Sequence, residues 1–275
     1  MAKLTRREEA AHRRACELLA LPRPLTDDEA MQVLEDWHEA ASMDRAARGA
    51  YFTPMEMAYD FRLNVHGGRV IDLCAGTGRL AWWARDKWLR RANGEPPREL
   101  VCVERNRLYV EVGRRVLPEA TWICGDVFDV PGMGLGRFDC AISNPPFGPI
   151  TARAGSAPRY SGDRFEYHVI DLAADLARRG VFVIPQGSAP FRISGGPYRE
   201  QTSRELERFH AETGIRMDCG VGIDTTHYEG WRGVSPATEI VTCDFTERET
   251  PAAPPAPGAA VRPAGGQMEL FAALA

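Results

Sequence analysis

The sequence predicts an α/β fold, in which an open, mostly parallel β-sheet carries helices on both faces. Two observations predict it. From residue 69 onward, short apolar runs typical of buried strands alternate with amphipathic segments of helical period. The length of 275 residues suits one such domain with short extensions. The net charge of -4 gives no overall basic field, so any nucleic-acid contact must come from a local patch.

Residues 1–48 predict an N-terminal helical extension. The pattern of apolar and charged residues predicts an amphipathic helix over 3–20. Thr26, with Glu29 three residues later, is a capping box, and it predicts a second helix that ends near Gly49.

Residues 49–248 are expected to form the catalytic domain. Thr53 and Pro54 predict the start of a helix, with the proline at its first helical position. The predicted strands are 69–73, 99–104, 121–124, 138–143, 181–185, 217–223 and 239–245. The other predicted helices are 78–91, 106–116, 163–178, which Gly180 is expected to end, and 198–212.

The C-terminal region has a different composition. Residues 249–266 are mainly Pro, Ala and Gly, which predicts a linker, and a short tail of residues 267–275 follows. The first residues resemble neither a signal peptide nor a membrane span. No Cys/His cluster predicts a metal site, and the cysteines in strand-like runs are expected to be buried reduced thiols of a cytosolic protein: Cys102, Cys124, Cys140 and Cys243.

A glycine loop carries the first chemical motif, Asp72-Leu-Cys-Ala-Gly76-Thr-Gly78, between a predicted strand and a predicted helix. Glycines let the backbone approach a ligand closely, and ligands of open α/β sheets bind beyond the carboxyl ends of strands. An ordinary strand-to-helix turn is the alternative. Ala81 stands where the dinucleotide fingerprint has its third glycine, so a nucleotide oxidoreductase is a weaker alternative.

Acidic residues end the next two predicted strands. Glu104 could accept both ribose hydroxyls of a nucleoside cofactor, and Asp126 could accept a hydrogen bond from the amino group of its adenine. Either acid alone could simply be solvated. Their spacing after the glycine loop makes the set more specific than its members.

The run Asn144-Pro145-Pro146-Phe147 follows the predicted strand 138–143. Two prolines keep the chain extended, so that the side-chain oxygen of Asn144 and the carbonyl of Pro145 can both be presented to a ligand. Two such acceptors could hold an amino group and make its nitrogen nucleophilic, while Phe147 stacks on the base. A rigid turn with a core phenylalanine is the alternative.

In this order, the motifs resemble those of the amino-methyltransferases, specifically the adenine-N6 branch. Tyr51-Phe52-Thr53-Pro54 is similar to the segment that helps hold the methionine part of the cofactor in DNA adenine methyltransferases, and its place before the glycine loop matches their gamma motif order. The resemblance covers roughly residues 49–245. It implies the methyltransferase (Rossmann-like) fold with seven strands, the last antiparallel. It also implies S-adenosyl-L-methionine as cofactor, methyl transfer to N6 of adenine in DNA, and a cytoplasmic, nucleoid-associated enzyme.

The same resemblance assigns roles to individual residues. It implies these cofactor contacts: Tyr51, Phe52, Thr53, Pro54, Asp72, Cys74, Ala75, Gly76, Gly78, Glu104, Asp126, Val127 and Asn144. It implies these catalytic residues: Asn144, Pro145, Pro146 and Phe147. The cytosine-N4 branch usually has serine where Asn144 stands, so adenine is favoured.

DNA contacts are expected from two loops after predicted strands. Gamma-ordered enzymes usually carry a separate recognition domain, but here the sheet is expected to end near residue 246. Either short loops therefore read the target, or specificity is low. The candidate phosphate contacts are Arg153, Arg159, Arg164 and Arg192. Ordinary solvated arginines are the alternative. Tyr228 and Trp231 could stack on bases or pack a hairpin.

Three other functions stay open on the sequence: adenine-N6 methylation of RNA, methylation of a protein glutamine, and a non-catalytic cofactor-binding partner of the replication machinery. The tail adds a partner. Gln267, Leu270 and Phe271, within residues 267–271, resemble the peptide by which bacterial replication proteins bind the sliding clamp. A tail that packs on its own domain or stays free is the alternative.

Overall fold

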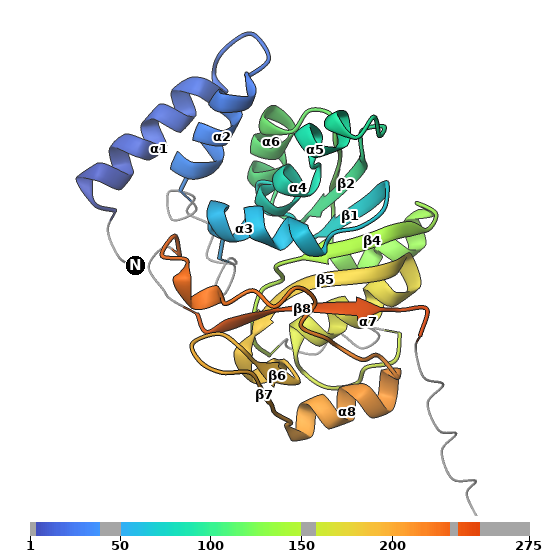
Figure 1. Ribbon diagram of the computed structural model, residues 1–275. Coiled ribbons are helices and arrows are strands. Elements are labelled where there is room, and N and C mark those ends of the chain that lie inside the picture. Colours follow the sequence, from blue (N-terminus) through green and yellow to red (C-terminus); the bar gives the residue numbers. More distant parts are fainter. Residues whose placement is uncertain (1–3, 39–50, 150–157, 232–235, 248–275) are drawn as a thin grey trace, which may run out of the picture.

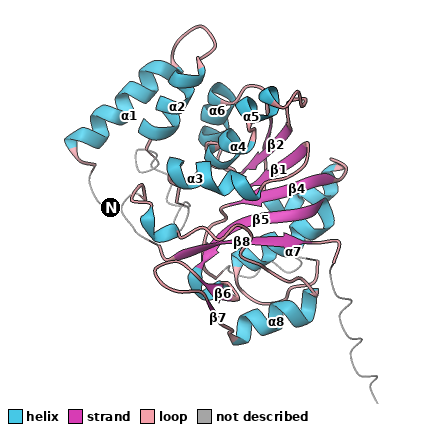
Figure 2. Cartoon of the chain, in the orientation of Figure 1, coloured by secondary structure: helices cyan, strands magenta, loops and turns pink. Residues whose placement is uncertain are grey.

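The computed structural model describes residues 4–38, 51–149, 158–231 and 236–247. A six-stranded sheet lies at its centre, with helices on both faces (Figures 1 and 2). The strand order is β3-β2-β1-β4-β5-β8, and β8 alone among these six runs antiparallel to its neighbour. The strands are β1 (Arg69–Leu73), β2 (Glu99–Glu104), β3 (Thr121–Cys124), β4 (Phe138–Ser143), β5 (Ala177–Pro185) and β8 (Thr238–Asp244).

Helices cover both faces of the sheet, because successive apolar side chains of each strand point to opposite faces and both sets must be buried. On β1, Val70 packs on the side of the first helices, while Ile71 packs on the opposite side. The helices of the first side are α3 (Met55–Phe61), α4 (Arg79–Ala84), α5 (Lys87–Ala92) and α6 (Arg107–Val116). Those of the second side are α7 (Phe165–Leu176) and α8 (Arg204–Thr213). Both faces are therefore buried, as a parallel sheet requires.

The N-terminal extension is a pair of helices, α1 (Arg6–Leu19) and α2 (Asp27–Asp36), beside α6 (Figure 1). The predicted capping box is confirmed, because the Thr26 hydroxyl accepts from the Glu29 N–H and the Glu29 carboxylate accepts from the Thr26 N–H. Arg115 of α6 donates to the carbonyls of Leu19 and Leu21 at the end of α1. These bonds fix the helical pair against the sheet domain. Among the described helices, none is long and apolar enough to cross a membrane.

Several details of the predicted elements are wrong. The second predicted helix, expected to end near Gly49, ends as α2 at Asp36, where Trp37 adopts an extended conformation. The helix expected over 198–212 begins only at Arg204.

The other differences concern one strand and two more helices. Residues 217–223 form no strand, so the described sheet has six strands instead of seven; Asp218 makes a single bridge to β8, and the positive φ angles of Gly220 and Gly222 turn the chain away. Gly180 lies within β5, and α7 ends at Leu176. The helix expected over 78–91 is divided into α4 and α5.

A further error concerns the start of α3. Pro54 is its N-cap instead of its first helical residue, and the Thr53 hydroxyl does not cap the helix. The remaining short elements are the 3-10 turns Arg62–Asn64, Val127–Met133, Gln186–Ser188 and Thr225–His227, with the hairpin of β6 (Phe191–Arg192) and β7 (Arg199–Glu200).

The cysteines are all free thiols. Three of the four expected in the core are buried, on β2, β4 and β8: Cys102, Cys140 and Cys243. Cys124 is exposed, because it lies at the carboxyl end of β3, the outermost strand.

Candidate functional site

The strand order reverses between β1 and β4, and the crevice beyond the carboxyl ends of such neighbouring strands is the usual ligand site of open α/β sheets. The glycine loop leaves β1 here. Gly76 and Gly78 both have positive φ, at +57° and +94°, which favours glycine. A Cβ at Gly78 would lie 3.0 Å from the Trp122 ring, so the loop has no room for a side chain there.

Asp72 is the penultimate residue of β1, just before the glycine loop, and is only 2% exposed. Neither carboxylate oxygen makes a hydrogen bond of normal geometry with any residue that the structure describes. Burial raises the pKa of Asp72 well above its usual range, and the Ala81 N–H only partly opposes this while the charge of Glu104 adds to it. A buried carboxylate without partners is costly, and a ligand with a positive charge or donor groups would satisfy it.

Glu104 lies at the end of β2, the next strand. Its Oε2 accepts from the Gly76 N–H at 2.8 Å, and its Oε1 accepts from the Asn106 N–H at 2.7 Å. Burial raises the pKa of Glu104, and these backbone donors lower it in part. The predicted ribose-binding acid therefore lies directly against the glycine loop.

Asp126 follows β3, as predicted. Its Oδ1 accepts from the Phe128 N–H at 3.1 Å and caps the 3-10 turn that begins at Val127. Val127 is buried beneath that turn. The parallel register of β1, β2 and β3 thus places Asp72, Glu104 and Asp126 at one edge of the sheet.

Asn144 follows β4 on the other side of β1. Its Nδ2 donates to the carbonyl of Tyr51 and to the hydroxyl of Thr53, both at 2.9 Å. Asn144 lies 93 positions from Tyr51 and 91 positions from Thr53 in the sequence. These hydrogen bonds therefore join the Asn144–Phe147 motif to the Tyr51–Pro54 motif.

The proline pair holds the chain after Asn144. Pro145 is buried and Pro146 half-buried, and Phe147 is half-buried against the core cluster that includes Phe52. Gly148 then turns the chain with φ of +105°. The ring of Phe147 is therefore fixed on one side by the core.

A small cavity joins these motifs. Its lining residues are Tyr51, Phe52, Thr53, Asp72, Cys74, Ala75, Gly76, Thr77, Arg79, Leu80 and Asn144. Eight of these eleven are predicted cofactor residues. Pro54, another predicted cofactor residue, is buried as the N-cap of α3 and does not line the cavity.

Arg79 lines the same cavity, although the sequence did not predict it as a site residue. Its buried guanidinium donates to the carbonyl of Thr53 at 3.0 Å and to the carbonyl of Leu34 at 2.5 Å, and lies 5.1 Å from the centre of the Phe52 ring. One signal in the sequence could have identified it. An arginine in the first turn of an apolar helix is unfavourable with the helix dipole, so its presence there indicates a specific contact elsewhere.

The predicted phosphate contacts have different environments. Arg159 pairs with the buried carboxylate of Asp171 at 2.6 Å and with Asp175, so its charge is already countered within the chain. Arg164 is half-buried at the N-cap of α7. Arg192 lies in β6, where its Nε donates to the carbonyl of Ser194 at 3.4 Å. Arg153 lies outside the described residues. The DNA contacts stay predictions.

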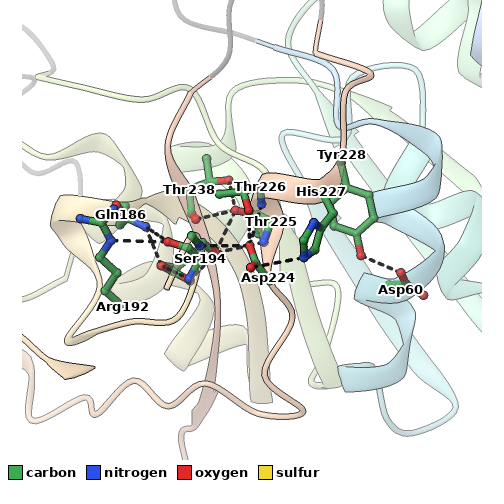
Figure 3. A network of polar contacts seen from close by, with 12 residues as sticks. Asp60, Gln186, Arg192, Ser194, Asp224, Thr225, Thr226, His227, Tyr228 and Thr238 are labelled. Carbon is green, nitrogen blue, oxygen red and sulfur yellow. Dashed lines mark hydrogen bonds and ion pairs between the residues drawn. The ribbon is translucent and has the colours of Figure 1, made fainter. Parts of the chain in front are cut away.

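A polar network fixes two loops at the β5–β8 edge (Figure 3). Glu239 of β8 accepts from the backbone and hydroxyl of Ser194 and from the side chain of Gln186. The Ser194 hydroxyl also accepts from Thr225, which begins the turn that leads to Tyr228. Tyr228 donates to Asp60 of α3 at 2.6 Å (Figure 3).

Tyr228 and Trp231 therefore have packing contacts in this structure. Trp231 is buried in the same core cluster as Phe52, and Tyr228 packs partly against that cluster. The tail residues 267–271, with Gln267, Leu270 and Phe271, and the linker 249–266 lie outside the described residues.

No model of a known protein family matches the chain, and no curated protein matches it in sequence. Solved structures do resemble it. A protein from Listeria monocytogenes, described as a class I S-adenosylmethionine-dependent methyltransferase, has a TM-score of 0.56 and 10% identity; the match covers 92% of this chain and 84% of that one.

Two type I restriction-modification proteins have similar scores. The Vibrio vulnificus modification subunit has a TM-score of 0.53 and 14% identity, over 82% of this chain and 51% of that chain. The Streptococcus thermophilus methyltransferase subunit has a TM-score of 0.54 and 14% identity, over 79% and 49%. This chain thus spans about half the length of these subunits. The likeness shows the fold: that of the S-adenosylmethionine-dependent methyltransferases, as the sequence predicts.

Proposed function

We propose that the chain is an S-adenosylmethionine-dependent methyltransferase that acts on the N6 amino group of adenine in DNA. One observation carries the proposal: the amide of Asn144 is held by its nitrogen, which leaves its oxygen to accept from a target amino group. The fold and the resemblance to type I restriction-modification subunits support DNA as the substrate.

The residues fit the cofactor. Asp72 is a buried carboxylate whose oxygens accept no hydrogen bond of normal geometry from the described residues, and S-adenosylmethionine carries two positive charges, on its sulfur and its amino group. The glycine loop would hold the methionine part, Glu104 the ribose hydroxyls, and Asp126 the adenine amino group. When bound, the cofactor supplies a methyl group that is already activated by its sulfonium.

The protein's contribution is then position and electrostatics. Asn144 Oδ1 and the Pro145 carbonyl would accept the two N–H groups of the target, which directs the nitrogen lone pair toward the methyl group. Phe147 would stack on the base, and that contact offsets part of the few kcal/mol that flipping a base from a duplex costs.

The experiment is transfer of a tritiated methyl group from S-adenosylmethionine to DNA, RNA and protein. We expect label in DNA only, and N6-methyladenine in the nucleosides by mass spectrometry. Label in RNA alone or in protein glutamine would identify one of the two enzymatic alternatives. No transfer, with cofactor binding intact, would favour the non-catalytic accessory protein.

The matched control is Asn144→Ala. Because Asn144 should contact the target amino group, the variant should lose transfer by at least a hundredfold. Cofactor affinity, measured by calorimetry, should fall much less. An equal loss of methyl transfer and of cofactor affinity would indicate that Asn144 contacts the cofactor instead of the target.

We also propose the bacterial sliding clamp as a partner through residues 267–271. The support is the resemblance of Gln267, Leu270 and Phe271 to a clamp-binding peptide. Such a short peptide loses entropy on docking, so its affinity should be about micromolar. A pull-down of a bacterial clamp with peptide 260–275 tests this, with Leu270→Ala/Phe271→Ala as control; binding that survives the double change removes the proposal.

A further inference from the structure

The Asn144 side chain has a defined orientation. Its amide group faces the backbone carbonyl of Tyr51, 2.9 Å from the nearer atom. A carbonyl oxygen can only accept a hydrogen bond, so the atom that faces it must be Nδ2. The opposite orientation would place Oδ1 against a second oxygen. The oxygen of the amide is therefore turned away from residues 51–53.

The proposed target requires this orientation of the Asn144 amide. A target amino group donates, so it requires Oδ1; a reversed amide would oppose two N–H groups and leave both unsatisfied. We propose that the hydroxyl of Thr53 is the positioning group that holds the Asn144 amide in its productive orientation. This rests on the proposed function, since an amino group is taken as the target.

Thr53 is well suited to this role because it cannot move easily. It is 3% exposed, and its hydroxyl accepts from Asn144 Nδ2 at 2.9 Å. Its carbonyl accepts from the buried guanidinium of Arg79 at 3.0 Å. Arg79 also donates to the carbonyl of Leu34 in α2, so three segments are tied to one side chain.

Arg79 directly follows Gly78 of the glycine loop and begins α4. The loop that should hold the cofactor and the residue that orients the target amide thus belong to one rigid unit. On the outer side, Gly230 lies against Pro54, where an added Cβ would come within 2.9 Å of the proline ring. The segment around Thr53 is packed on both sides.

The test compares Thr53→Val with Thr53→Ser. Valine keeps the shape of threonine and removes the hydroxyl, whereas serine keeps the hydroxyl. Thr213→Val is the matched control, because Thr213 is also buried and lies in α8. Its hydroxyl donates to the Phe209 carbonyl and accepts from the Ile215 N–H. The readouts are kcat and KM for DNA, cofactor affinity by calorimetry, and exchange of the Asn144 side-chain NH₂ with water by ¹⁵N NMR, assigned with Asn144→Ala.

We expect Thr53→Val to lower kcat about tenfold, the effect of about one neutral hydrogen bond. Cofactor affinity should stay within about twofold, and the Asn144 NH₂ should exchange at least tenfold faster. Thr53→Ser should restore both kcat and slow exchange, and Thr213→Val should change neither.

Three results would overturn the proposal: unchanged exchange in Thr53→Val, a Thr53→Ser variant as impaired as Thr53→Val, or a loss of cofactor affinity that accounts for the whole fall in activity. The NMR measurement needs no substrate. If wild-type protein methylates no nucleic acid, the proposed function fails, while the exchange rates still decide whether Thr53 orients Asn144.

Discussion

Asp72 and Glu239 are both buried carboxylates of the central sheet, 2% and 0% exposed, and their surroundings are opposite. Glu239 on β8 accepts four hydrogen bonds, from the side chain of Gln186, the N–H groups of Ile193 and Ser194, and the Ser194 hydroxyl. Asp72 on β1 accepts none of normal geometry from the described residues.

The difference separates a structural carboxylate from one available to a ligand. The chain provides every donor that Glu239 needs, and through it fixes the loops after β5 and before β8 (Figure 3). At Asp72 the chain leaves a costly group unsatisfied, at the strand end where ligands of this fold bind. Natural proteins accept such a cost mainly at functional sites.

The largest expected effect is at Glu239. In Glu239→Ala the donors of Ser194, Ile193 and Gln186 lose their acceptor inside the protein, and each buried unsatisfied group costs about 1–3 kcal/mol. The free energy of unfolding in urea should fall by about 3 kcal/mol or more. Glu99→Ala, at the exposed first position of β2, is the control and should cost less than about 1 kcal/mol. Equal losses would refute the structural role.

The next largest effect on stability is expected at Arg159, which is paired with carboxylates, in comparison with Arg192. Arg159→Met leaves Asp171, which is fully buried, without its cation, although the Arg159 and Tyr160 N–H groups still donate to it. We expect a loss of about 2–3 kcal/mol in unfolding free energy. Arg192→Met should change stability by less than about 0.5 kcal/mol.

The same two variants bear on DNA binding. If Arg192 contacts a phosphate, Arg192→Met should weaken DNA binding for all sequences and reduce the slope of log K against log salt by about 1. Arg159→Met, measured on protein that is still folded, should keep the wild-type slope. The reverse pattern would assign the phosphate contact to Arg159.

Asp72→Asn tests the unsatisfied carboxylate directly. Because burial raises the folded-state pKa of Asp72 above its unfolded value, the wild type loses stability as pH rises from the unfolded pKa through the folded one. Asparagine does not titrate. The variant should therefore gain stability over wild type as pH rises from 4 to 8, by about 1–2 kcal/mol at pH 8, and should bind S-adenosylmethionine less tightly.

Melting temperatures at several pH values and calorimetry check both halves of this prediction. A variant that is less stable than wild type throughout this range would mean that Asp72 has a structural partner. Unchanged cofactor affinity would mean that its carboxylate faces no ligand charge.

The smallest effect is at Cys74, also in the glycine loop. Its φ of +66° is a left-handed conformation, which costs a residue with a Cβ about 1–2 kcal/mol. Glycine avoids this cost but loses more chain entropy, so Cys74→Gly should stabilise by about 0.5 kcal/mol. Cys74→Ala keeps the Cβ and should bring no gain; a gain equal to that of glycine would exclude backbone strain as the cause.

Much of the site was predictable because its motifs are local. The glycine loop, Glu104 and Asn144 each follow a predicted strand, and parallel strands bring their carboxyl ends to one edge. The missing strand at 217–223 was harder to foresee, because its residues alternate like a strand. Gly220 adopts a positive φ where the chain packs against Asn64, which lies far away in sequence and accepts from the Val221 N–H.

The sequence by itself determined the fold class and the order of the motifs around the crevice, because strand pattern and turn chemistry depend on neighbouring residues. The antiparallel last strand was expected only from the family resemblance. Only the tertiary structure decided which polar groups find partners. Thr53 accepts from Asn144 and Arg79, which lie far from it in sequence, and Glu239 of β8 accepts from Ser194 in a loop. Asp72 accepts no hydrogen bond of normal geometry from the described chain. Hydrogen bonds between residues dozens of positions apart depend on distances that no local pattern encodes.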